Sequence, residues 1–268
     1  MTPWQAILLG ILQGLTEFLP VSSSGHLVII PHILGWPDPG IFMDAMLHTG
    51  TLVAIVLYFL EDIARLVKAA VTSLRNRTLA DPDARLAWGL AIGTLPGAII
   101  GFLLEDWFAR LFGNPSAAAM FLLGTAFLLI LSEYIGKKNR PITSISWFEA
   151  LIIGIAQALA IAPGLSRSGL TISAGLMLGF RREDAARYSF LLAIPIMLGV
   201  TGYNLLKLVT GHAVYASLGL VALGTFCAVL AGYLAITGLL ALVRRSSLWP
   251  FAVYCIVLSA LVLLGIIG

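Results

Sequence analysis

The chain alternates long apolar stretches with short polar connections, and this pattern predicts helices that cross a membrane. A bilayer core about 30 Å thick takes about 20 helical residues, so only the longest apolar stretches qualify. Six stretches are long enough, and the loops between them hold most of the charged residues. The predicted spans cover roughly residues 43–61, 88–105, 117–135, 187–207, 215–242 and 249–267.

Two further apolar stretches, near residues 4–33 and 147–180, do not fit simple spans. Each begins with a helix of about 16 residues, which would reach only about 24 Å into a core of about 30 Å. The first then breaks at Pro20 and the second at Pro163 and Gly164. A polar break at membrane depth must be buried in protein or line a cavity. We therefore predict two re-entrant helix pairs, each entering and leaving on the same side.

The two interrupted stretches are near copies of each other. Residues 10–25 read GILQGLTEFLPVSSSG, and residues 154–169 read GIAQALAIAPGLSRSG. Aligned without a gap, seven positions are identical, including Gln13 with Gln157 and three residues of each serine-rich turn. Paired interrupted segments in the two halves of a membrane protein are the best sequence pointer to a binding site between the repeats.

Each predicted re-entrant pair is followed by three spans. Because three is odd, the two halves have opposite orientations in the membrane, which is an inverted-topology repeat. The sequence therefore predicts an all-α integral membrane protein with six transmembrane helices and two re-entrant helix pairs. We expect one membrane domain over residues 1–268, with the first repeat at about 1–140 and the second at about 141–268.

The distribution of charge supports this topology and gives it an orientation. Only 11% of the residues are charged and 59% are hydrophobic, whereas a soluble domain is about 25% charged. In the re-entrant topology, every Lys and Arg falls on one side except Arg110, Lys207 and the intramembrane Arg167. Basic loops are cytoplasmic, so both termini should be external and the first pair should open outward. The net charge of +3 reflects these loops, and we expect no nucleic-acid partner.

A carboxylate and a guanidinium group lie at the predicted breaks, in a chain with few charges. Glu17 follows Gln13 by one helical turn, so the two side chains share a face. An ionisable residue at membrane depth costs on the order of 3 kcal/mol and is a functional hypothesis by default. Arg167 occupies the position that Ser23 has in the first copy, and its planar fork suits a phosphate or a carboxylate. The alternative is a structural ion pair between Glu17 and Arg167.

Hydroxyl groups surround both breaks. Short helices that begin near Gly25 and Gly169 would direct backbone N–H groups into the same space, and such helix N-termini are ready phosphate sites. For any one of the serines, capping of the following helix is the alternative. The candidate substrate-binding residues are Gln13, Ser22, Ser24, Gly25, Ser166, Ser168, Gly169 and Thr171.

His26 directly follows the first serine-rich turn. Beside a carboxylate, hydroxyls and an arginine, it is a candidate general base. His32 and His48 could lie near the outer mouth, but they lack such neighbours in the sequence. Together the groups suit cleavage of a phosphate ester or a diphosphate, and anion transport is the alternative.

Glycines recur every four residues in the second predicted span, at Gly89, Gly93, Gly97 and Gly101. Such a stripe of small residues lets another helix approach closely. Packing within the chain is the simpler interpretation, and the face of a homodimer is the alternative.

The residues around the two breaks resemble the bacterial undecaprenyl-diphosphate phosphatases, the bacitracin-resistance proteins. The first motif of that family is Glu or Gln, three residues, Glu, and then F-L-P-[VI]-S-S-[ST]-G-H. It is matched by Gln13, Glu17 and residues 18–26. The second motif, P-G-x-S-R-S-G-x-T, is matched by residues 163–171, and the stretch at 181–195 is also similar. The resemblance covers essentially the whole chain.

The resemblance implies an enzyme of the bacterial cytoplasmic membrane that removes the terminal phosphate of undecaprenyl diphosphate at the outer face. The product would be the monophosphate carrier that is reused for cell-wall polymers. The resemblance also implies a divalent metal, with Mg²⁺ the first choice, and partners limited to the polyprenyl diphosphate substrate and membrane lipids. One departure is His48, which stands where the family has a glutamine. A flippase of polyprenyl phosphate lipids is the alternative function.

On this basis we hypothesise four catalytic residues. Arg167 would clamp the diphosphate, and Glu17, with Gln13 beside it, would hold the metal or orient the base. Ser23 would be the nucleophile, and His26 would be its base and then its acid. Direct attack by water or by His26 is the alternative.

Overall fold

The computed structural model describes residues 1–36, 39–103, 114–209 and 217–267. Within these ranges the regular structure is helical, apart from one isolated β-bridge between Arg140 and Phe180. Arg110 lies outside the described residues, and so does the side chain of Lys207. The outer positions expected for these two cations therefore stay predictions.

The helices fall into two runs, each of which begins with a pair of short helices. The first run consists of α1 (Pro3–Phe18), α2 (Ser23–Ile33), α3 (Ile41–Tyr58), α4 (Leu60–Asn76), α5 (Pro82–Leu103) and α7 (Pro115–Ile135). The second consists of η1 (Ile142–Ser144), α8 (Trp147–Leu159), α9 (Arg167–Met177), α10 (Arg182–Val209), α11 (Leu218–Val243) and α12 (Trp249–Leu263).

Each predicted span corresponds to one helix. In the described part of the chain, four helices are long and apolar enough to cross a membrane, namely α5, α7, α11 and the Arg182–Tyr203 part of α10. The other two, α3 and α12, are apolar but shorter. The predicted class, an all-α membrane protein, is confirmed.

Helix α4 was not predicted, because its sequence mixes charged and apolar residues, a pattern that is typical of a cytoplasmic loop. It starts directly after Phe59, where α3 ends. The helix forms because Leu66, Ala69 and Ser73 recur at helical spacing and are buried, on the side that contacts α5.

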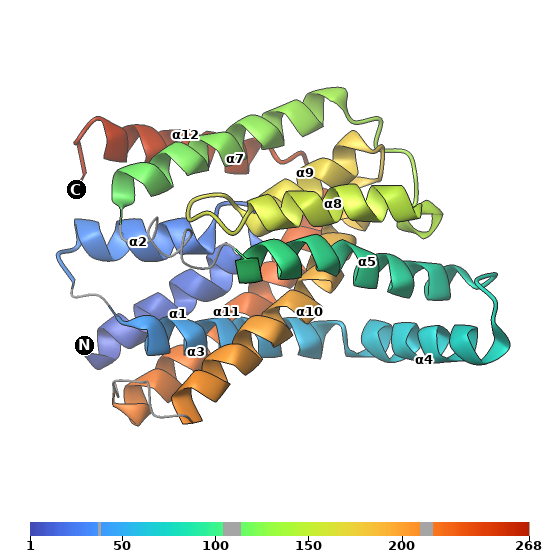
Figure 1. Cartoon of the computed structure of the whole chain (residues 1–268). Coiled ribbons are helices and arrows are strands. Elements are labelled where there is room, and N and C mark those ends of the chain that lie inside the picture. Colours follow the sequence, from blue (N-terminus) through green and yellow to red (C-terminus); the bar gives the residue numbers. More distant parts are fainter. Residues whose placement is uncertain (37–38, 104–113, 210–216, 268) are drawn as a thin grey trace.

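The two re-entrant pairs enter the molecule from opposite ends (Figure 1). α1 runs inward from the end at which both chain termini lie, and α2 returns to that end. α8 runs inward from the opposite end, and α9 returns there. The turns of the two pairs therefore meet inside the molecule, as the inverted repeat predicts.

Glycines at equivalent positions allow the first helix of each pair to pack tightly. A Cβ added at Gly10 in α1 would lie 2.2 Å from the carbonyl oxygen of Gly224 in α11. A Cβ added at Gly154 in α8 would lie 2.4 Å from the carbonyl oxygen of Gly93 in α5. Each re-entrant helix thus packs against a long helix of the other half, so the two halves interlock.

The two pairs also begin with the same type of cap. The Thr2 hydroxyl accepts the N–H of Gln5, and the Gln5 side chain accepts the N–H of Thr2. Ser146 and Glu149 repeat both bonds at the start of α8. Because a capping box fixes where a helix begins, α1 and α8 start at equivalent residues of the two copies.

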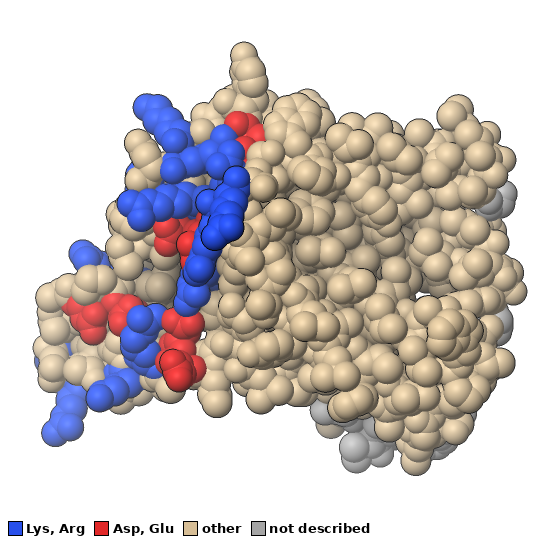
Figure 2. Space-filling view, turned by 180° about the vertical axis from the view of Figure 1, so that it is seen from behind, with Lys and Arg blue, Asp and Glu red and all other residues tan. Residues whose placement is uncertain are grey.

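Lys and Arg side chains gather at one end of the molecule (Figure 2). At this end Glu133 of α7 accepts two hydrogen bonds from Arg182, at 2.8 and 2.6 Å, and one from the backbone N–H of Leu248. These bonds tie the ends of α7, α10 and α12 together. The rest of the described surface in that view lacks basic residues, as expected for a protein with one basic, cytoplasmic side.

The glycine stripe of α5 packs within the chain. A Cβ at Gly93 would lie 3.0 Å from the carbonyl oxygen of Ala150, and one at Gly97 would lie 3.6 Å from Gln157 Nε2. Both neighbours belong to α8. The packing interpretation is therefore correct, and this stripe does not form a homodimer face because α8 already covers it.

Candidate active site

The turns of the two re-entrant pairs touch each other. The turn of the second pair is built on Gly164, which has φ +97, and a Cβ there would lie 2.1 Å from the carbonyl oxygen of Ala118. The Cα of Gly164 is 3.2 Å from the Cβ position of Gly25 in the other turn. Ser168 Oγ also donates to the carbonyl oxygen of Leu19 at 3.1 Å. Residues far apart in sequence are therefore in direct contact inside the molecule.

Serines at equivalent positions cap the two helices that leave these turns. Ser22 Oγ accepts the N–H of Gly25 at 3.3 Å, and Ser166 Oγ accepts the N–H of Gly169 at 3.0 Å. Ser22 has a positive φ of 69, which is uncommon for a residue with a side chain. In the structure both serines therefore act as helix N-caps, which is the alternative interpretation of their hydroxyl groups.

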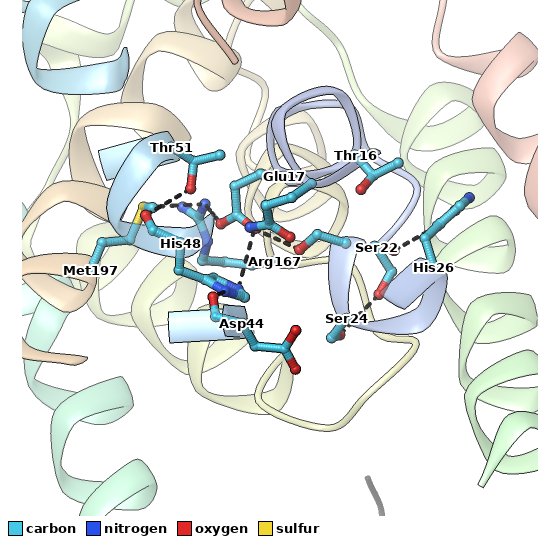
Figure 3. A network of polar contacts seen from close by, with 12 residues as sticks. Thr16, Glu17, Ser22, Ser24, His26, Asp44, His48, Thr51, Arg167 and Met197 are labelled. Atoms are coloured by element: carbon cyan, nitrogen blue, oxygen red, sulfur yellow. Dashed lines mark hydrogen bonds and ion pairs between the residues drawn. The ribbon is translucent and has the colours of Figure 1, made fainter. Parts of the chain in front are cut away.

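Glu17 is the centre of the polar network inside the molecule (Figure 3). It is buried, and its two oxygens have different partners. Oε1 accepts a hydrogen bond from Arg167 Nη2 at 2.7 Å. Oε2 accepts one from Ser23 Oγ at 2.5 Å and one from Gln13 Nε2 at 3.1 Å. The structure thus brings together Glu17, Ser23, Gln13 and Arg167, as the sequence predicted.

Arg167 is the only contribution of the second re-entrant pair to the contacts of this carboxylate. Its Nη2 atom holds Glu17 and also lies 3.9 Å from Met197 Sδ. Its Nη1 atom is buried and has no hydrogen-bond partner among the residues that the structure describes. A buried donor without a partner is costly, so the ion pair alone does not explain this guanidinium group. The Nη1 atom therefore has hydrogen bonds left to donate.

His26 does not lie where the proposed role as base of Ser23 needs it. Its Nδ1 is 2.7 Å from the carbonyl oxygen of Ser22, and its Nε2 is 2.7 Å from the Tyr254 hydroxyl. The ring also stacks on that of Tyr254, and it points away from Glu17 (Figure 3). His26 therefore links α2 to α12, and the group in contact with Ser23 is Glu17 instead.

His48 lies in the network, although none of the candidate catalytic residues is close to it in the sequence. Its Nε2 is 3.8 Å from Glu17 Oε2, and its Nδ1 is 2.9 Å from the carbonyl oxygen of Asp44. It comes from α3, which packs beside α1. The resemblance led us to expect a glutamine at this position. The histidine found there is the feature of the sequence that could have indicated a role for His48.

Three other predicted substrate-binding hydroxyls bond within the protein. Ser24 Oγ lies 3.3 Å from Ser22 Oγ and accepts the N–H of Gly164. Ser168 holds the first turn, as described above. Thr171 Oγ1 bonds to the carbonyl oxygen of Arg167 and to Ser189 Oγ, at 2.7 and 2.6 Å. Thr171 lies one turn along α9 and bonds to a serine of α10, and its role in substrate binding stays a prediction.

The donor set near Glu17 fits a metal ion only if the substrate supplies further ligands. Among the described residues, no group of three or more His, Cys, Asp or Glu side chains is arranged to hold an ion. Mg²⁺ in phosphate-transfer sites usually takes one or two carboxylates, substrate phosphates and water. Glu17 offers a carboxylate, and Gln13 Oε1 is buried without a partner beside it. These oxygens suit a cation that is bound together with a diphosphate.

The chain matches one protein family over nearly its whole length. The sequence profile described as "Bacitracin resistance protein BacA" matches residues 6–261. A protein of Geobacter metallireducens named undecaprenyl-diphosphatase is 44% identical over 267 residues, 99% of both chains. One of the same name from Moorella thermoacetica is 43% identical over 262 residues, 98% of this chain and 97% of the relative. A third, from Thioalkalivibrio sulfidiphilus, is 41% identical over 263 residues, 98% of both chains.

The chain therefore belongs to the family of bacitracin resistance protein BacA. It is a multi-pass membrane protein of a bacterium.

Proposed function

We propose that this protein hydrolyses undecaprenyl diphosphate to undecaprenyl phosphate and inorganic phosphate. It is an enzyme, an undecaprenyl-diphosphatase like its relatives. The reaction recycles the lipid carrier for cell-wall synthesis and supports resistance to bacitracin.

One observation carries the chemical part of this proposal. A serine hydroxyl, a carboxylate and a guanidinium group from two different re-entrant pairs converge inside the molecule, at 2.5 Å and 2.7 Å. Such a set combines a nucleophile, a base and an anion-binding group, which phosphate-transfer chemistry needs.

Arg167 binds the diphosphate. Its Nη1 atom, buried without a partner, donates to a terminal phosphate oxygen and stabilises the charge that develops there. The N-termini of α2 and α9 face the same space and add backbone N–H groups, which favour a phosphate. The polyprenyl chain stays in the lipid, so the protein needs no large apolar cavity for it.

Ser23 attacks the terminal phosphorus atom. Glu17 orients the hydroxyl, and its carboxylate takes the proton as the new O–P bond forms. The bond between the terminal phosphorus and the bridging oxygen breaks, and undecaprenyl phosphate leaves. Water then attacks the phosphorus of the phosphoserine, and the bond between Ser23 Oγ and phosphorus breaks. Glu17 returns its proton to Ser23 Oγ, and inorganic phosphate leaves. The net reaction consumes one water molecule.

Glu17 and Gln13 Oε1 would hold a divalent cation, with Mg²⁺ the first choice, together with oxygens of the diphosphate. Bound in this way, the cation would neutralise negative charge on the phosphates. The side chains described above carry out every other step of the reaction.

We place the site and both termini on the outer side of the cytoplasmic membrane. The basic end of the molecule supports this orientation (Figure 2), because Lys and Arg favour the cytoplasmic side. The first re-entrant pair, which carries Glu17 and Ser23, opens to the other end (Figure 1).

Transport of the lipid without cleavage is the weaker alternative. A transporter would need Arg167 to bind the phosphate, but it would not need a serine hydroxyl bonded to a buried carboxylate at 2.5 Å.

The test is phosphate release from undecaprenyl diphosphate by the purified protein in detergent. We expect one phosphate per lipid, loss of release with EDTA, and recovery when Mg²⁺ is added. A protein that binds the lipid but releases no phosphate in Mg²⁺ would contradict the enzyme proposal. Full phosphate release in EDTA would contradict only the proposed need for a divalent cation, and the enzyme proposal would stand.

A further inference from the structure

His48 is placed and oriented in a way that the reaction described above does not use. Its side chain is partly buried and points from α3 toward Glu17 (Figure 3). The atom nearest the carboxylate is Nε2, at 3.8 Å from Oε2. This distance is too long for a direct hydrogen bond, but it is short enough for both atoms to contact one cation.

The other ring nitrogen fixes the chemical character of Nε2. Nδ1 lies 2.9 Å from the carbonyl oxygen of Asp44, and a carbonyl oxygen only accepts. Nδ1 therefore carries the hydrogen, and in the neutral ring the lone pair of Nε2 points toward Glu17. Histidines that bind metals almost always donate their other N–H to a carboxylate, a backbone carbonyl or water. His48 has this arrangement.

A third donor is free at the same carboxylate oxygen. Gln13 is fully buried, and within the described part of the chain its Oε1 atom has no hydrogen-bond partner. Its amide contacts Glu17 Oε2 at 3.1 Å, the same oxygen that His48 faces. Arg167 occupies the opposite oxygen, Oε1. An imidazole nitrogen and an amide group thus both approach Glu17 Oε2, and the amide has an oxygen to spare.

We propose that His48 Nε2, Glu17 Oε2 and Gln13 Oε1 are the protein ligands of the divalent cation, and that His48 makes the site selective for a transition ion such as Mn²⁺ over Mg²⁺. The proposal rests on the proposed function, since the cation would act on the diphosphate in this same site. Oxygen ligands suit Mg²⁺, Ca²⁺ and Mn²⁺, whereas an imidazole ligand favours the transition ions. One histidine among oxygen ligands therefore shifts the preference without excluding Mg²⁺.

The test uses Mn²⁺ as the probe and measures binding directly. Protein without an affinity tag is purified in detergent, stripped with EDTA and titrated with Mn²⁺, alone and with inorganic diphosphate. The electron paramagnetic resonance signal of free Mn²⁺ reports binding. Electron spin-echo modulation of bound Mn²⁺ reports whether a ¹⁴N nucleus is coordinated. We expect one bound Mn²⁺ with ¹⁴N modulation, displaced by Mg²⁺ only in large excess.

Two variants assign the nitrogen. His48→Gln should lose the ¹⁴N modulation and bind Mn²⁺ about tenfold or more weakly, while Mg²⁺ competes better than before. His32→Gln is the matched control, because His32 is exposed near the end of α2. It should keep the modulation and the affinity of the wild type.

The outcomes separate this inference from the proposed function. Bound Mn²⁺ without ¹⁴N modulation in the wild type, no Mn²⁺ binding even with diphosphate, or modulation that persists in His48→Gln would each overturn the role of His48. The wild-type spectrum decides the matter even if His48→Gln does not fold. Phosphate release in Mg²⁺ is measured on the same preparations. Release without ¹⁴N modulation refutes only the role of His48, and bound Mn²⁺ without release refutes only the enzyme proposal.

Discussion

Arg167 holds Glu17 with one nitrogen and keeps another buried without a partner. We expect Arg167→Ala to lower kcat by about 100-fold or more, the usual effect of removing a group that stabilises transition-state charge. Arg167→Lys keeps the charge but loses the planar fork, so it should recover only a small part of the activity. The measurement is phosphate release at saturating lipid, with thermal unfolding as the control for folding. Near-normal turnover in a folded Arg167→Ala protein would contradict the phosphate-clamp role.

Ser23 and Ser22 are neighbours with different partners, and this difference makes a matched pair of variants. Ser23 bonds Glu17, whereas Ser22 caps α2. Ser23→Ala should abolish phosphate release while the lipid still binds, because loss of a nucleophile costs about 1,000-fold or more. Ser22→Ala should cost only about 1 kcal/mol of stability and leave most of the turnover. If Ser23→Ala keeps a tenth or more of the wild-type rate, Ser23 is not the nucleophile, and the assignment shifts to water or to His26.

The sequence predicted that Glu17, Ser23 and Arg167 lie together, and in the structure they do. These three residues could be recognised from the neighbouring sequence, because charges and hydroxyls are unusual at a break in an apolar stretch. The sequence did not predict that His26 bonds Tyr254 or that His48 approaches Glu17. The direction of His26 depends on Tyr254, which is 228 positions away in the chain. The approach of His48 depends on how α3 packs beside α1. Contacts of this kind leave no pattern in a single sequence.

At the scale of the elements, the two re-entrant pairs share a frame and differ in their chemistry. Their caps, tight glycines and serine turns are equivalent. The first pair carries Glu17 and Ser23, whereas the second has Ile161 and Arg167 at those positions. Each copy therefore supplies a different part of one site. This division explains why the sequence could predict both pairs from their internal resemblance, while α4, which has no such counterpart, was missed.

The contact between α8 and α5 should be sensitive to a single methyl group. In Gly154→Ala, the new Cβ would lie 2.4 Å from the carbonyl oxygen of Gly93, so the two helices must move apart. We expect a loss of about 1 to 3 kcal/mol, as for overpacking in a core, seen as a lower Tm. Gly238→Ala in α11 is the matched control, because nothing lies within 4 Å of its Cβ position, and its Tm should stay equal or rise slightly. Equal Tm values for the two variants would contradict the tight α5–α8 contact.

At the scale of the whole molecule, the position of the site depends on how the chain is threaded through the membrane. The re-entrant topology places Thr2 and Leu34, at the two ends of the first pair, on the same side of the membrane. It places Arg77, just after α4, on the other. All three are exposed. If α1 and α2 together formed a simple span, Thr2 and Leu34 would lie on opposite sides instead.

Single cysteines at these positions distinguish the two topologies. The natural Cys227 and Cys255 are first replaced by alanine, and this background must retain phosphate release. In intact cells, a membrane-impermeant maleimide should label Thr2→Cys and Leu34→Cys. Arg77→Cys should react only after the cells are permeabilised, because it lies at the basic end of the molecule, which the positive-inside rule assigns to the cytoplasm. Labelling of Thr2→Cys without Leu34→Cys would refute the re-entrant pair. If Arg77→Cys alone is labelled in intact cells, the re-entrant pair is still supported, but the protein has the opposite orientation and the site faces the cytoplasm.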